Sequence, residues 1–285
     1  MDVSIIIVSY NTSVLLQECL ASLRLSTDVK KETFVIDNCS VDNSAQIVTE
    51  YFPEARLFVN NKNKGFGAAS NQVLKDCRGR YVVFLNPDTR VKPDTLQNTV
   101  AFMDVSQHIG LAGAKILNPD GTLQESVSYR YPGEKFTSGE TDALKGNIAC
   151  VLGAFMIARK ELMTTIGGFD EDFFLYGEDQ DLAWRIREKG FCIGYIDDAE
   201  VFHWGGQSES GTSPIALFEK KIKAEYLFYS KHYKSDTIAR IKRSEKLKAL
   251  YRLITLRMTM PFVRNRIKLQ DKIDRYRLIY YMTRA

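Results

Sequence analysis

Hydrophobic and polar positions follow two alternating patterns over the first third of the chain. Short apolar runs rich in β-branched residues predict strands at residues 3–8, 33–36, 57–59 and 81–85. Stretches whose apolar residues recur at helical spacing lie between them, near residues 14–23, 42–51 and 66–77. Strands and helices that alternate at this interval are typical of right-handed βαβ units. The pattern therefore predicts an α/β fold with a mostly parallel sheet flanked by helices.

This rhythm breaks after residue 117. A polar, loop-like stretch follows over residues 123–146. The later elements are an apolar strand signal at 148–158, a helix at 178–189 and a strand at 191–196. We therefore expect one α/β domain over residues 1–213, with a first half of about 1–117 and a second half of about 118–213.

Charge divides the chain where the sheet pattern ends. Residues 215–285 carry 19 Lys and Arg against 6 Asp and Glu, whereas residues 1–214 carry 20 against 29. The basic region has two helical apolar stripes, with most basic side chains off them. The first stripe is Leu247, Leu250, Tyr251, Ile254 and Met258, and the second is Leu269, Ile273, Tyr276 and Tyr280. We expect residues 214–285 to form a basic amphipathic helical region.

Basic amphipathic helices that carry tyrosines suit the surface of an anionic membrane. The same stripes also suit packing on the α/β domain or on a second subunit, as in a homo-oligomer. Nucleic acid ranks below both partners, because no base-reading motif accompanies the charge. The sequence predicts an anionic membrane surface as the partner of residues 214–285, and no nucleic acid.

The composition, with 45% apolar and 26% charged residues, is that of a globular protein. The cysteines at 19, 39, 77, 150 and 192 are odd in number and contain no CxxC, which argues against a disulfide framework or a thiolate zinc site. The chain starts without a basic signal-peptide region, and no apolar run approaches the roughly 18 residues of a membrane span. We therefore expect a cytoplasmic protein.

Glycines are absent from the turn that follows the first predicted strand. That turn reads Ser9-Tyr10-Asn11-Thr12, and the first glycine of the chain is Gly65. A dinucleotide site needs glycines there so that the backbone can approach a pyrophosphate, and no GxxxxGK[ST] motif occurs either. NAD-dependent enzymes and P-loop NTPases are therefore excluded.

Two residues are candidates for holding a metal. Asp88 follows the strand at 81–85, where a carboxylate together with substrate phosphate oxygens can bind Mg²⁺ or Mn²⁺. The alternative is that Asp88 only shapes a turn after Pro87. His203 is followed by two glycines that allow close backbone approach, which indicates a metal or phosphate contact; the alternative is a packed histidine.

The segment of residues 167–181 combines six carboxylates with four aromatic residues. Glu178, Asp179 and Asp181 complement the N-terminal dipole of the predicted helix, which is one explanation. It leaves the other carboxylates and the aromatic residues unexplained, and a carboxylate beside aromatic walls suits general-base work on a hydroxyl. We expect Asp179 to be a catalytic base that the helix N-terminus keeps ionised.

Six motifs in order give the chain a family resemblance over roughly residues 2–210. They are SIIIVSYN (4–11), VIDNCSVDNS (35–44), NKGFGAASNQ (63–72), FLNPDT (84–89), GAFMIARKE (153–161) and GGFDEDFFLYGEDQDLAWRIREKG (167–190). Together they resemble the inverting GT-A glycosyltransferases of family 2, particularly the rhamnosyltransferase-type members of bacterial surface polysaccharide synthesis. The resemblance implies a nucleotide-sugar half in the first 117 residues and an acceptor half up to residue 213.

The resemblance also implies residue roles. The nucleotide sugar would be bound by Tyr10, Asn11, Asp37, Asn63, Gly65, Asn86 and Asp88, with Asp37 reading the pyrimidine imide. The metal, Mg²⁺ or Mn²⁺, would be held by Asp88 and His203, and the catalytic acidic pair would be Glu178 and Asp179. The family's DxD motif reads Asn86-Pro87-Asp88 here, which leaves a single carboxylate.

These implications predict an inverting, metal-dependent transferase. It would move a sugar, L-rhamnose from dTDP-rhamnose as the first expectation and a UDP-sugar's sugar as the alternative, to a saccharide or polyprenyl-diphosphate-linked acceptor. Such an acceptor predicts a peripheral position on the inner face of the cell membrane. The alternative function, raised by the weakened DxD motif, is a catalytically silent nucleotide-sugar-binding protein that recruits partners through its basic tail.

Overall fold

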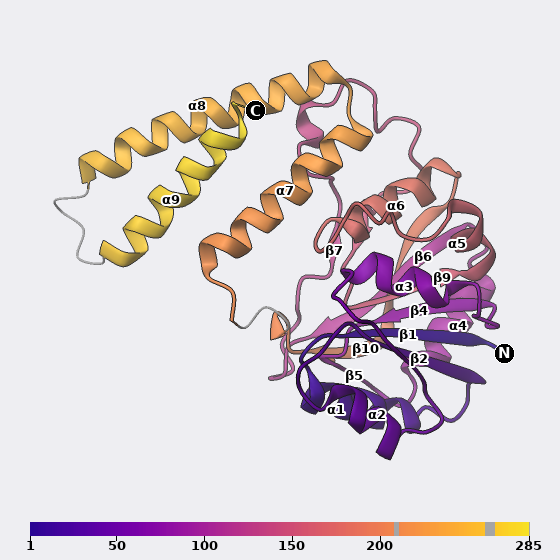
Figure 1. Cartoon of the computed structure of the whole chain (residues 1–285). Coiled ribbons are helices and arrows are strands. Elements are labelled where there is room, and N and C mark those ends of the chain that lie inside the picture. Colours follow the sequence, from indigo (N-terminus) through magenta and orange to yellow (C-terminus); the bar gives the residue numbers. More distant parts are fainter. Residues whose placement is uncertain (208–210, 260–265, 285) are drawn as a thin grey trace. The chain divides into compact units, whose positions relative to one another are not determined.

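A computed structural model describes residues 1–207, 211–259 and 266–284 and divides into two compact units (Figure 1). Unit 1 comprises Met1–Tyr131 and Leu144–Ser210, and unit 2 comprises Pro132–Ala143 and Gly211–Ala285. The functional division between residues 1–213 and 214–285 stays a prediction.

Unit 1 is built on one eight-stranded sheet in the order β3-β2-β1-β4-β9-β6-β10-β5. Its strands are β1 (Val3–Ser9), β2 (Lys31–Asp37), β3 (Arg56–Val59), β4 (Tyr81–Leu85), β5 (Thr89–Val91), β6 (Ile109–Leu117), β9 (Phe155–Arg159) and β10 (Cys192–His203). β9 and β5 run antiparallel to their neighbours, and the other strands run parallel to one another. The mostly parallel sheet is confirmed, and the last strand extends seven residues past its predicted end at 196 because it pairs with both β6 and β5.

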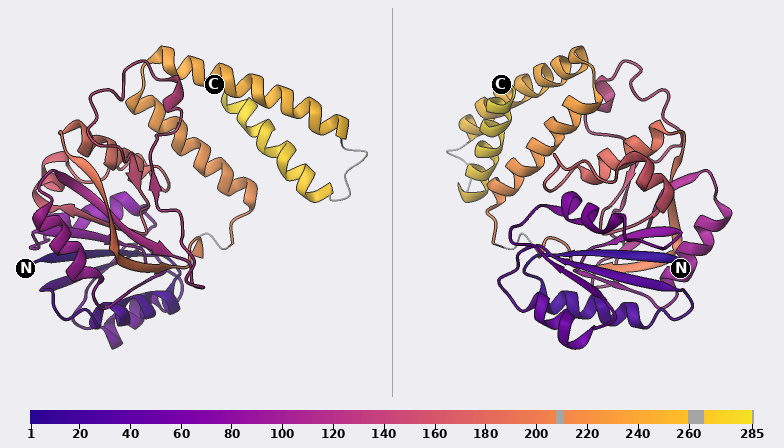
Figure 2. Two further views of the ribbon diagram at one scale, coloured as in Figure 1. Left: turned by 180° about the vertical axis from the view of Figure 1, so that it is seen from behind. Right: turned by 45° about the vertical axis from the view of Figure 1, so that its right-hand side comes forward.

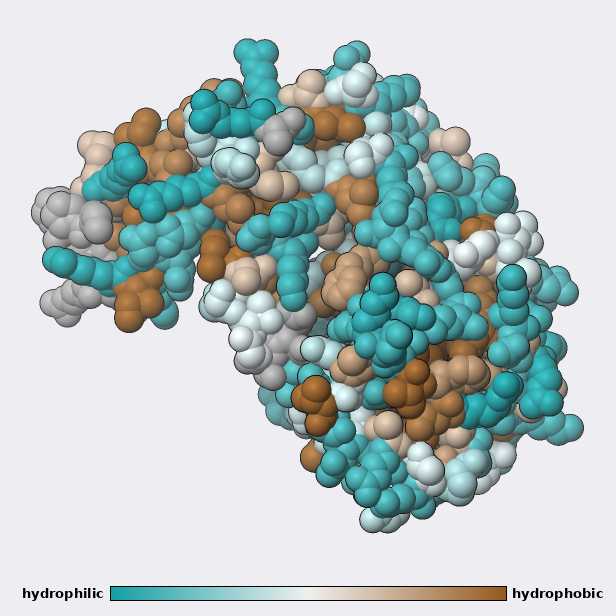
Figure 3. Space-filling model, viewed as in Figure 1, coloured by the Kyte–Doolittle hydropathy of each residue, from teal (hydrophilic) through white to brown (hydrophobic). Residues whose placement is uncertain are grey.

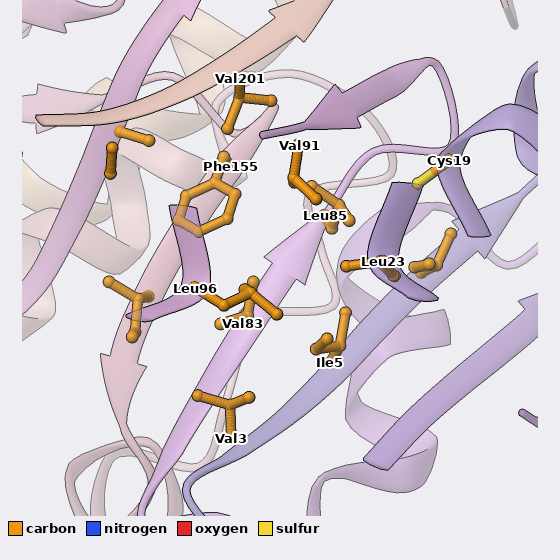
Figure 4. Packing of buried hydrophobic residues seen from close by; sticks show 14 of the residues in the cluster. Val3, Ile5, Cys19, Leu23, Val83, Leu85, Val91, Leu96, Phe155 and Val201 are labelled. Atoms are coloured by element: carbon orange, nitrogen blue, oxygen red, sulfur yellow. The ribbon is translucent and has the colours of Figure 1, made fainter. Parts of the chain in front are cut away.

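Helices cover both faces of this sheet, as the turned views in Figure 2 show. One face carries α1 (Ser13–Arg24), α2 (Ser44–Tyr51) and α4 (Thr95–Val105), and the other carries α3 (Phe66–Leu74), α5 (Lys160–Ile166) and α6 (Glu178–Glu188). β1 is buried along its whole length, and its side chains alternate between the two cores. Ile5 and Ile7 join the first core, which Figure 4 shows, whereas Ile6 and Val8 join the second.

Two short strands complete unit 1. β7 (Val127–Ser128) pairs antiparallel with β8 (Cys150–Val151). They lie within the connection between β6 and β9, part of which belongs to unit 2.

Unit 2 consists of α7 (Pro214–His232), α8 (Ser235–Thr259), α9 (Arg266–Met282) and the short helix η1 (Glu134–Phe136). The side chain of Ser213 caps α7 by accepting a hydrogen bond from the Ala216 N–H at 3.4 Å. The Tyr233 hydroxyl donates to the Pro132 carbonyl at 2.6 Å, and the Thr237 hydroxyl donates to Glu140 Oε1 at 2.6 Å. These bonds tie the loop of residues 132–143 to the helices of this unit.

The two predicted apolar stripes of unit 2 differ in exposure. Leu269 and Ile273 of α9 are buried, whereas the α8 stripe is exposed, from 37% at Leu250 to 71% at Met258. Figure 3 shows hydrophobic side chains among hydrophilic ones over these helices. Among the residues that the structure describes, no helix combines the length and the apolar character needed to cross a membrane.

Candidate active site

The sheet gathers the candidate residues at one edge. The parallel strands β1, β2, β4, β6 and β10 all end at this edge, and the antiparallel strands β9 and β5 begin there. Register pairs make this explicit, because Leu85 of β4 lies opposite Phe155 of β9 and His203 of β10 lies opposite Thr89 of β5. Ligands of open α/β sheets bind at this edge.

Asp37, the last residue of β2, has an unused acceptor atom. The side chain is 2% exposed, and its Oδ2 accepts a hydrogen bond from the Ser40 N–H at 3.1 Å. Its Oδ1 is buried and has no hydrogen-bond partner among the described residues. A buried carboxylate oxygen without a donor is costly, so this atom suits an N–H group of a ligand.

Two of the predicted nucleotide-binding residues have their side-chain oxygens bonded within the loops. Asn11 takes a positive φ of 53°, and its Oδ1 accepts from the Val41 N–H at 2.8 Å. Asn63 Oδ1 accepts from the Gly65 N–H at 2.9 Å and from Asn38 Nδ2 at 2.8 Å. These oxygens therefore shape the site. The amide NH₂ groups of Asn11 and Asn63 make no hydrogen bond within the described parts of the chain and can donate to a ligand. Tyr10 follows β1 and is half-buried.

Asn38 is the centre of this loop network, a role that the sequence analysis did not assign. Its Nδ2 also donates to the Gly65 carbonyl at 3.2 Å, and its Oδ1 accepts from Asn60 Nδ2 at 3.1 Å and from the Lys64 N–H at 3.0 Å. A fully bonded, 2% exposed amide fixes the turn that follows β3. Its position directly after Asp37 was the available signal.

Gly65 brings this turn against the acidic segment. It has a φ of +81°, and a Cβ at residue 65 would overlap the Phe174 carbonyl oxygen and lie 2.9 Å from Phe174 Cα. The Phe66 N–H donates to the same carbonyl at 3.1 Å. The turn that follows β3 and the segment before α6 are therefore in direct backbone contact.

Asp88 and His203 form a buried pair at this edge, where β10 meets β5. Asp88 is 5% exposed and His203 is 8% exposed, and His203 Nε2 lies 3.4 Å from Asp88 Oδ1. The other ring nitrogen, Nδ1, lies 2.8 Å from Gln124 Oε1. No sequence motif marks Gln124 as a functional residue. Its position after the turn that follows β6 is the one indication in the sequence that it lies near the strand ends.

This pair fits a divalent cation. An imidazole nitrogen and a carboxylate oxygen that face each other offer two ligand atoms, and Mn²⁺ accepts this mixed set more readily than Mg²⁺, which prefers oxygen. No group of three or more His, Cys, Asp or Glu gathers in the described parts of the chain. The remaining ligands would therefore be substrate oxygens and water, as is usual for such ions at phosphate sites. Asn86 holds the loop through its backbone, since its N–H donates to the Ala154 carbonyl at 3.0 Å.

Glu178 and Asp179 begin α6 and lie at the same edge. Asp179 Oδ1 accepts from the Gln180 N–H at 2.8 Å, and a Cβ at Gly153 would lie 3.9 Å from Asp179 Oδ2. Gly153 precedes Ala154, whose carbonyl binds Asn86. The start of β9 thus connects the loop that carries Asp88 to the acidic pair.

Burial changes the protonation expected for this pair. It raises the pKa of Glu178 to about 8, with the Asp179 charge as the second cause. Burial also raises the pKa of Asp179, although backbone N–H groups of Gln180 and Gly153 act to lower it. The expectation that the helix N-terminus alone keeps Asp179 ionised was therefore incomplete, because desolvation outweighs the hydrogen bonds. Burial therefore favours the protonated form of both carboxyl groups, and Glu178 Oε2 is buried without a partner among the described residues.

This shift predicts a pH-dependent stability. The ordinary pKa of a glutamate is 4.5, and that of folded Glu178 is about 8. Between these two pH values the unfolded protein has released a proton that the folded protein keeps, so the free energy of unfolding falls as pH rises. Glu178→Gln removes this proton release. Relative to wild type, we expect the variant to gain about 3 kcal/mol between pH 5 and pH 8, as measured by urea unfolding. Glu18→Gln, at an exposed position of α1, is the control and should show the same pH dependence as wild type. A Glu178→Gln variant whose stability changes with pH as that of wild type does would contradict the raised pKa of Glu178.

Solved structures of other proteins have a similar architecture. A mannosyltransferase from Pyrobaculum calidifontis, solved with GDP-Man and Mn²⁺, superposes with a TM-score of 0.61 at 17% identity, covering 98% of this chain and 86% of that one. S. aureus TarS residues 1–349 in complex with UDP-GlcNAc superposes with a TM-score of 0.55 at 20% identity, covering 100% of this chain and 92% of that one. The α/β fold, with its mostly parallel sheet and helical C-terminal region, is the GT-A fold that the sequence predicts.

Sequence comparison defines the family. Residues 4–167 match Glycosyl transferase family 2, and the chain belongs to this family. It is 25% identical over 254 residues to the N-acetylglucosaminyl-diphospho-decaprenol L-rhamnosyltransferase of Mycobacterium tuberculosis, covering 79% of this chain and 82% of that protein. It is also 36% identical over 98 residues to the chondroitin synthase of Escherichia coli, covering 33% of this chain and 14% of that protein.

Proposed function

We propose that this protein is an inverting glycosyltransferase that moves a sugar from a nucleotide-sugar donor to an acceptor hydroxyl. The observation that carries the proposal is the placement of Asp88, His203 and Asp179 at one sheet edge, linked through the start of β9. The UDP-GlcNAc and GDP-Man complexes of the structural neighbours support a nucleotide-sugar donor.

The donor side follows from Asp37 and Asp88. The unpartnered Asp37 Oδ1 would accept the imide N–H of a uracil or thymine base. Asp88 and His203 would hold a divalent cation, Mn²⁺ or Mg²⁺, which supplies positive charge to a diphosphate leaving group when bound. Tyr10, Asn11, Asn63, Gly65 and Asn86 line the same strand ends and would frame the nucleotide.

The transfer is a single displacement. Asp179 accepts the proton of the acceptor hydroxyl while the acceptor oxygen bonds to the anomeric carbon. The bond from that carbon to the diphosphate oxygen breaks, and its electron pair leaves with the nucleoside diphosphate. Attack opposite the leaving group inverts the configuration. A protonated Glu178 beside Asp179 would add no second negative charge, which would favour Asp179 as the ionised base.

For the substrates we propose L-rhamnose, donated by dTDP-rhamnose, and a saccharide or polyprenyl-diphosphate-linked saccharide acceptor. The mycobacterial rhamnosyltransferase of 25% identity supports this choice, because its name specifies a diphospho-decaprenol acceptor and an L-rhamnosyl group. UDP-sugars are the alternative donors. The role would lie in the synthesis of bacterial cell-surface polysaccharide.

Calorimetry and product analysis test this function. Wild type should bind dTDP or UDP more tightly than GDP, and Asp37→Asn should lose that preference, because the amide can present a donor to the imide N–H. With dTDP-rhamnose, a polyprenyl-diphosphate-linked saccharide and Mn²⁺, NMR should show a product of inverted anomeric configuration. A chain that binds the donor but transfers nothing would instead be a silent binding protein.

We further propose that residues 214–285 contact an anionic membrane on the cytoplasmic side. The exposed α8 stripe carries Lys246 and Arg257 along one side and Lys248 and Arg252 along the other, by helical spacing. Apolar insertion flanked by cations suits anionic lipid headgroups, and a lipid-linked acceptor would be presented there.

Replacing Leu247, Ile254 and Met258 together by serine should lower binding to phosphatidylglycerol vesicles at least tenfold in a flotation assay. The control replaces three exposed valines of unit 1 by serine: Val14, Val41 and Val105, which are 68%, 92% and 83% exposed. Equal flotation of both triple variants would contradict the membrane surface. A concentration-dependent rise in molar mass that only the α8 variant loses would show a second copy as the partner instead.

A further inference from the structure

We infer that Gln124 is a positioning residue that decides which ring nitrogen of His203 carries the proton, so that Nε2 keeps its lone pair for a cation shared with Asp88. This inference rests on the metal-assisted function proposed above. It assigns a role to a side chain that neither binds the donor nor contacts the reacting atoms.

The orientation of the Gln124 amide is fixed by a chain of hydrogen bonds. The Thr122 hydroxyl donates to Asp120 Oδ1 at 2.6 Å, so its oxygen accepts from Asn118 Nδ2 at 3.0 Å. Asn118 Oδ1 is then turned toward Gln124 Nε2, which donates to it at 3.3 Å. The Gln124 carbonyl oxygen is left to face His203.

The backbone holds Gln124 in the same place. Its N–H donates to the Ile116 carbonyl of β6 at 2.9 Å, and the neighbouring residues Leu117 and Leu123 form an antiparallel bridge. β6 and β10 are paired in the sheet. The distance between Gln124 and His203 is thus set by strand pairing rather than by a loose loop.

The carbonyl oxygen of Gln124 can only accept, so His203 Nδ1, at 2.8 Å, is the donor. In a neutral imidazole the other nitrogen, Nε2, then carries a lone pair. That lone pair faces Asp88 Oδ1 at 3.4 Å in a site where both side chains are more than nine-tenths buried. Two electron-rich atoms facing each other away from water are unfavourable on their own, and a cation between them removes the conflict.

The opposite tautomer would close the site. With the proton on Nε2, His203 would donate to Asp88, and this bond would occupy both ligand atoms. Mutation of a residue that hydrogen-bonds the second ring nitrogen of a metal-binding histidine typically weakens metal affinity by 10- to 100-fold. Gln124 therefore keeps the pair open for the metal.

The chain offers a clean readout, because it contains three histidines. In full-length protein labelled with ¹⁵N-histidine and free of metal, long-range ¹H–¹⁵N spectra should show a proton on Nδ1 of His203, with His108→Gln and His232→Gln providing the assignment. Gln124→Met removes the acceptor at similar size and should shift the proton to Nε2. Gln124→Glu keeps an acceptor and should retain the wild-type tautomer. Gln107→Met, at an exposed position, is the matched control.

Titration with Mn²⁺ alone, followed by EPR, gives the second readout. The dissociation constant should rise 10- to 100-fold in Gln124→Met and stay near wild type in Gln124→Glu and Gln107→Met. A wild-type His203 without a proton on Nδ1 would overturn the role of Gln124, as would weaker Mn²⁺ binding by Gln124→Met with the wild-type tautomer unchanged. Failure of wild type to bind Mn²⁺, even with UDP present, would instead contradict the metal site of the proposed function.

Discussion

Asp179→Asn is expected to lower the rate of sugar transfer by about 10³-fold while donor affinity stays close to that of wild type. Asparagine has nearly the same shape and can keep the hydrogen bond from the Gln180 N–H, which is 2.8 Å long in the structure. It cannot take a proton from the acceptor hydroxyl. The loss therefore falls on kcat, as measured by release of nucleoside diphosphate, and not on donor binding, as measured by calorimetry.

Asp172→Asn is the control for this experiment. Asp172 is an exposed carboxylate in the same acidic segment, six residues before Glu178, where α6 begins. Its replacement should leave kcat within a few-fold of wild type, because it is not on α6. Full activity in Asp179→Asn would remove this residue from the role of base, and equal losses in both variants would point to a general effect of charge.

Gly65→Ala is expected to destabilise the protein by about 3 kcal/mol, measured as the free energy of unfolding in urea. Alanine has to adopt a φ of +81°, and its Cβ would overlap the Phe174 carbonyl and lie 2.9 Å from Phe174 Cα. Backbone atoms cannot move aside as a flexible side chain can. The hydrogen bond from the Phe66 N–H to the Phe174 carbonyl would be lost with the contact.

The chain contains a matched glycine for comparison. Gly121 has nearly the same φ, +84°, but a Cβ there would meet no atom within 4 Å. Gly121→Ala should therefore cost only the backbone strain, about 1 kcal/mol. The difference between the two variants measures the contact between the turn after β3 and the segment before α6. Equal losses would mean that this contact adds no stability.

Local patterns were sufficient to predict the first strands and helices and the edge at which they meet. β4 begins and ends at the predicted residues 81 and 85. Asp88 follows β4 as expected, and Asp37 is the last residue of β2, one position beyond the predicted strand end. Pairing between distant strands was beyond such patterns. The insertion of β9 between β4 and β6, antiparallel to both, depends on contacts between residues more than 40 positions apart, which no local periodicity records.

The sequence predicted where the candidate site residues lie better than it predicted the hydrogen bonds that their side chains make. The motifs that contain Asn11 and Asn63 give no sign that the side-chain oxygens of these residues accept hydrogen bonds from backbone N–H groups of the loops. Gln124 was missed because its partner, His203, lies 79 residues away on another strand. The α8 stripe was found, but its exposure depends on the opposite face of α8, where Ala249 is fully buried.

The reversed direction of β9 has a consequence for how such an enzyme changes its specificity. β6 leaves the sheet at the edge that holds the candidate site, and β9 enters the sheet at that same edge. The whole excursion from residue 118 to residue 154 therefore departs from and returns to the edge that holds the candidate site. Insertions, deletions or exchanges between β7 and β8 leave the eight strands of the main sheet in register. Under the proposed function, evolution could therefore exchange the acceptor while Asp37 and Asp88 keep their places at the strand ends.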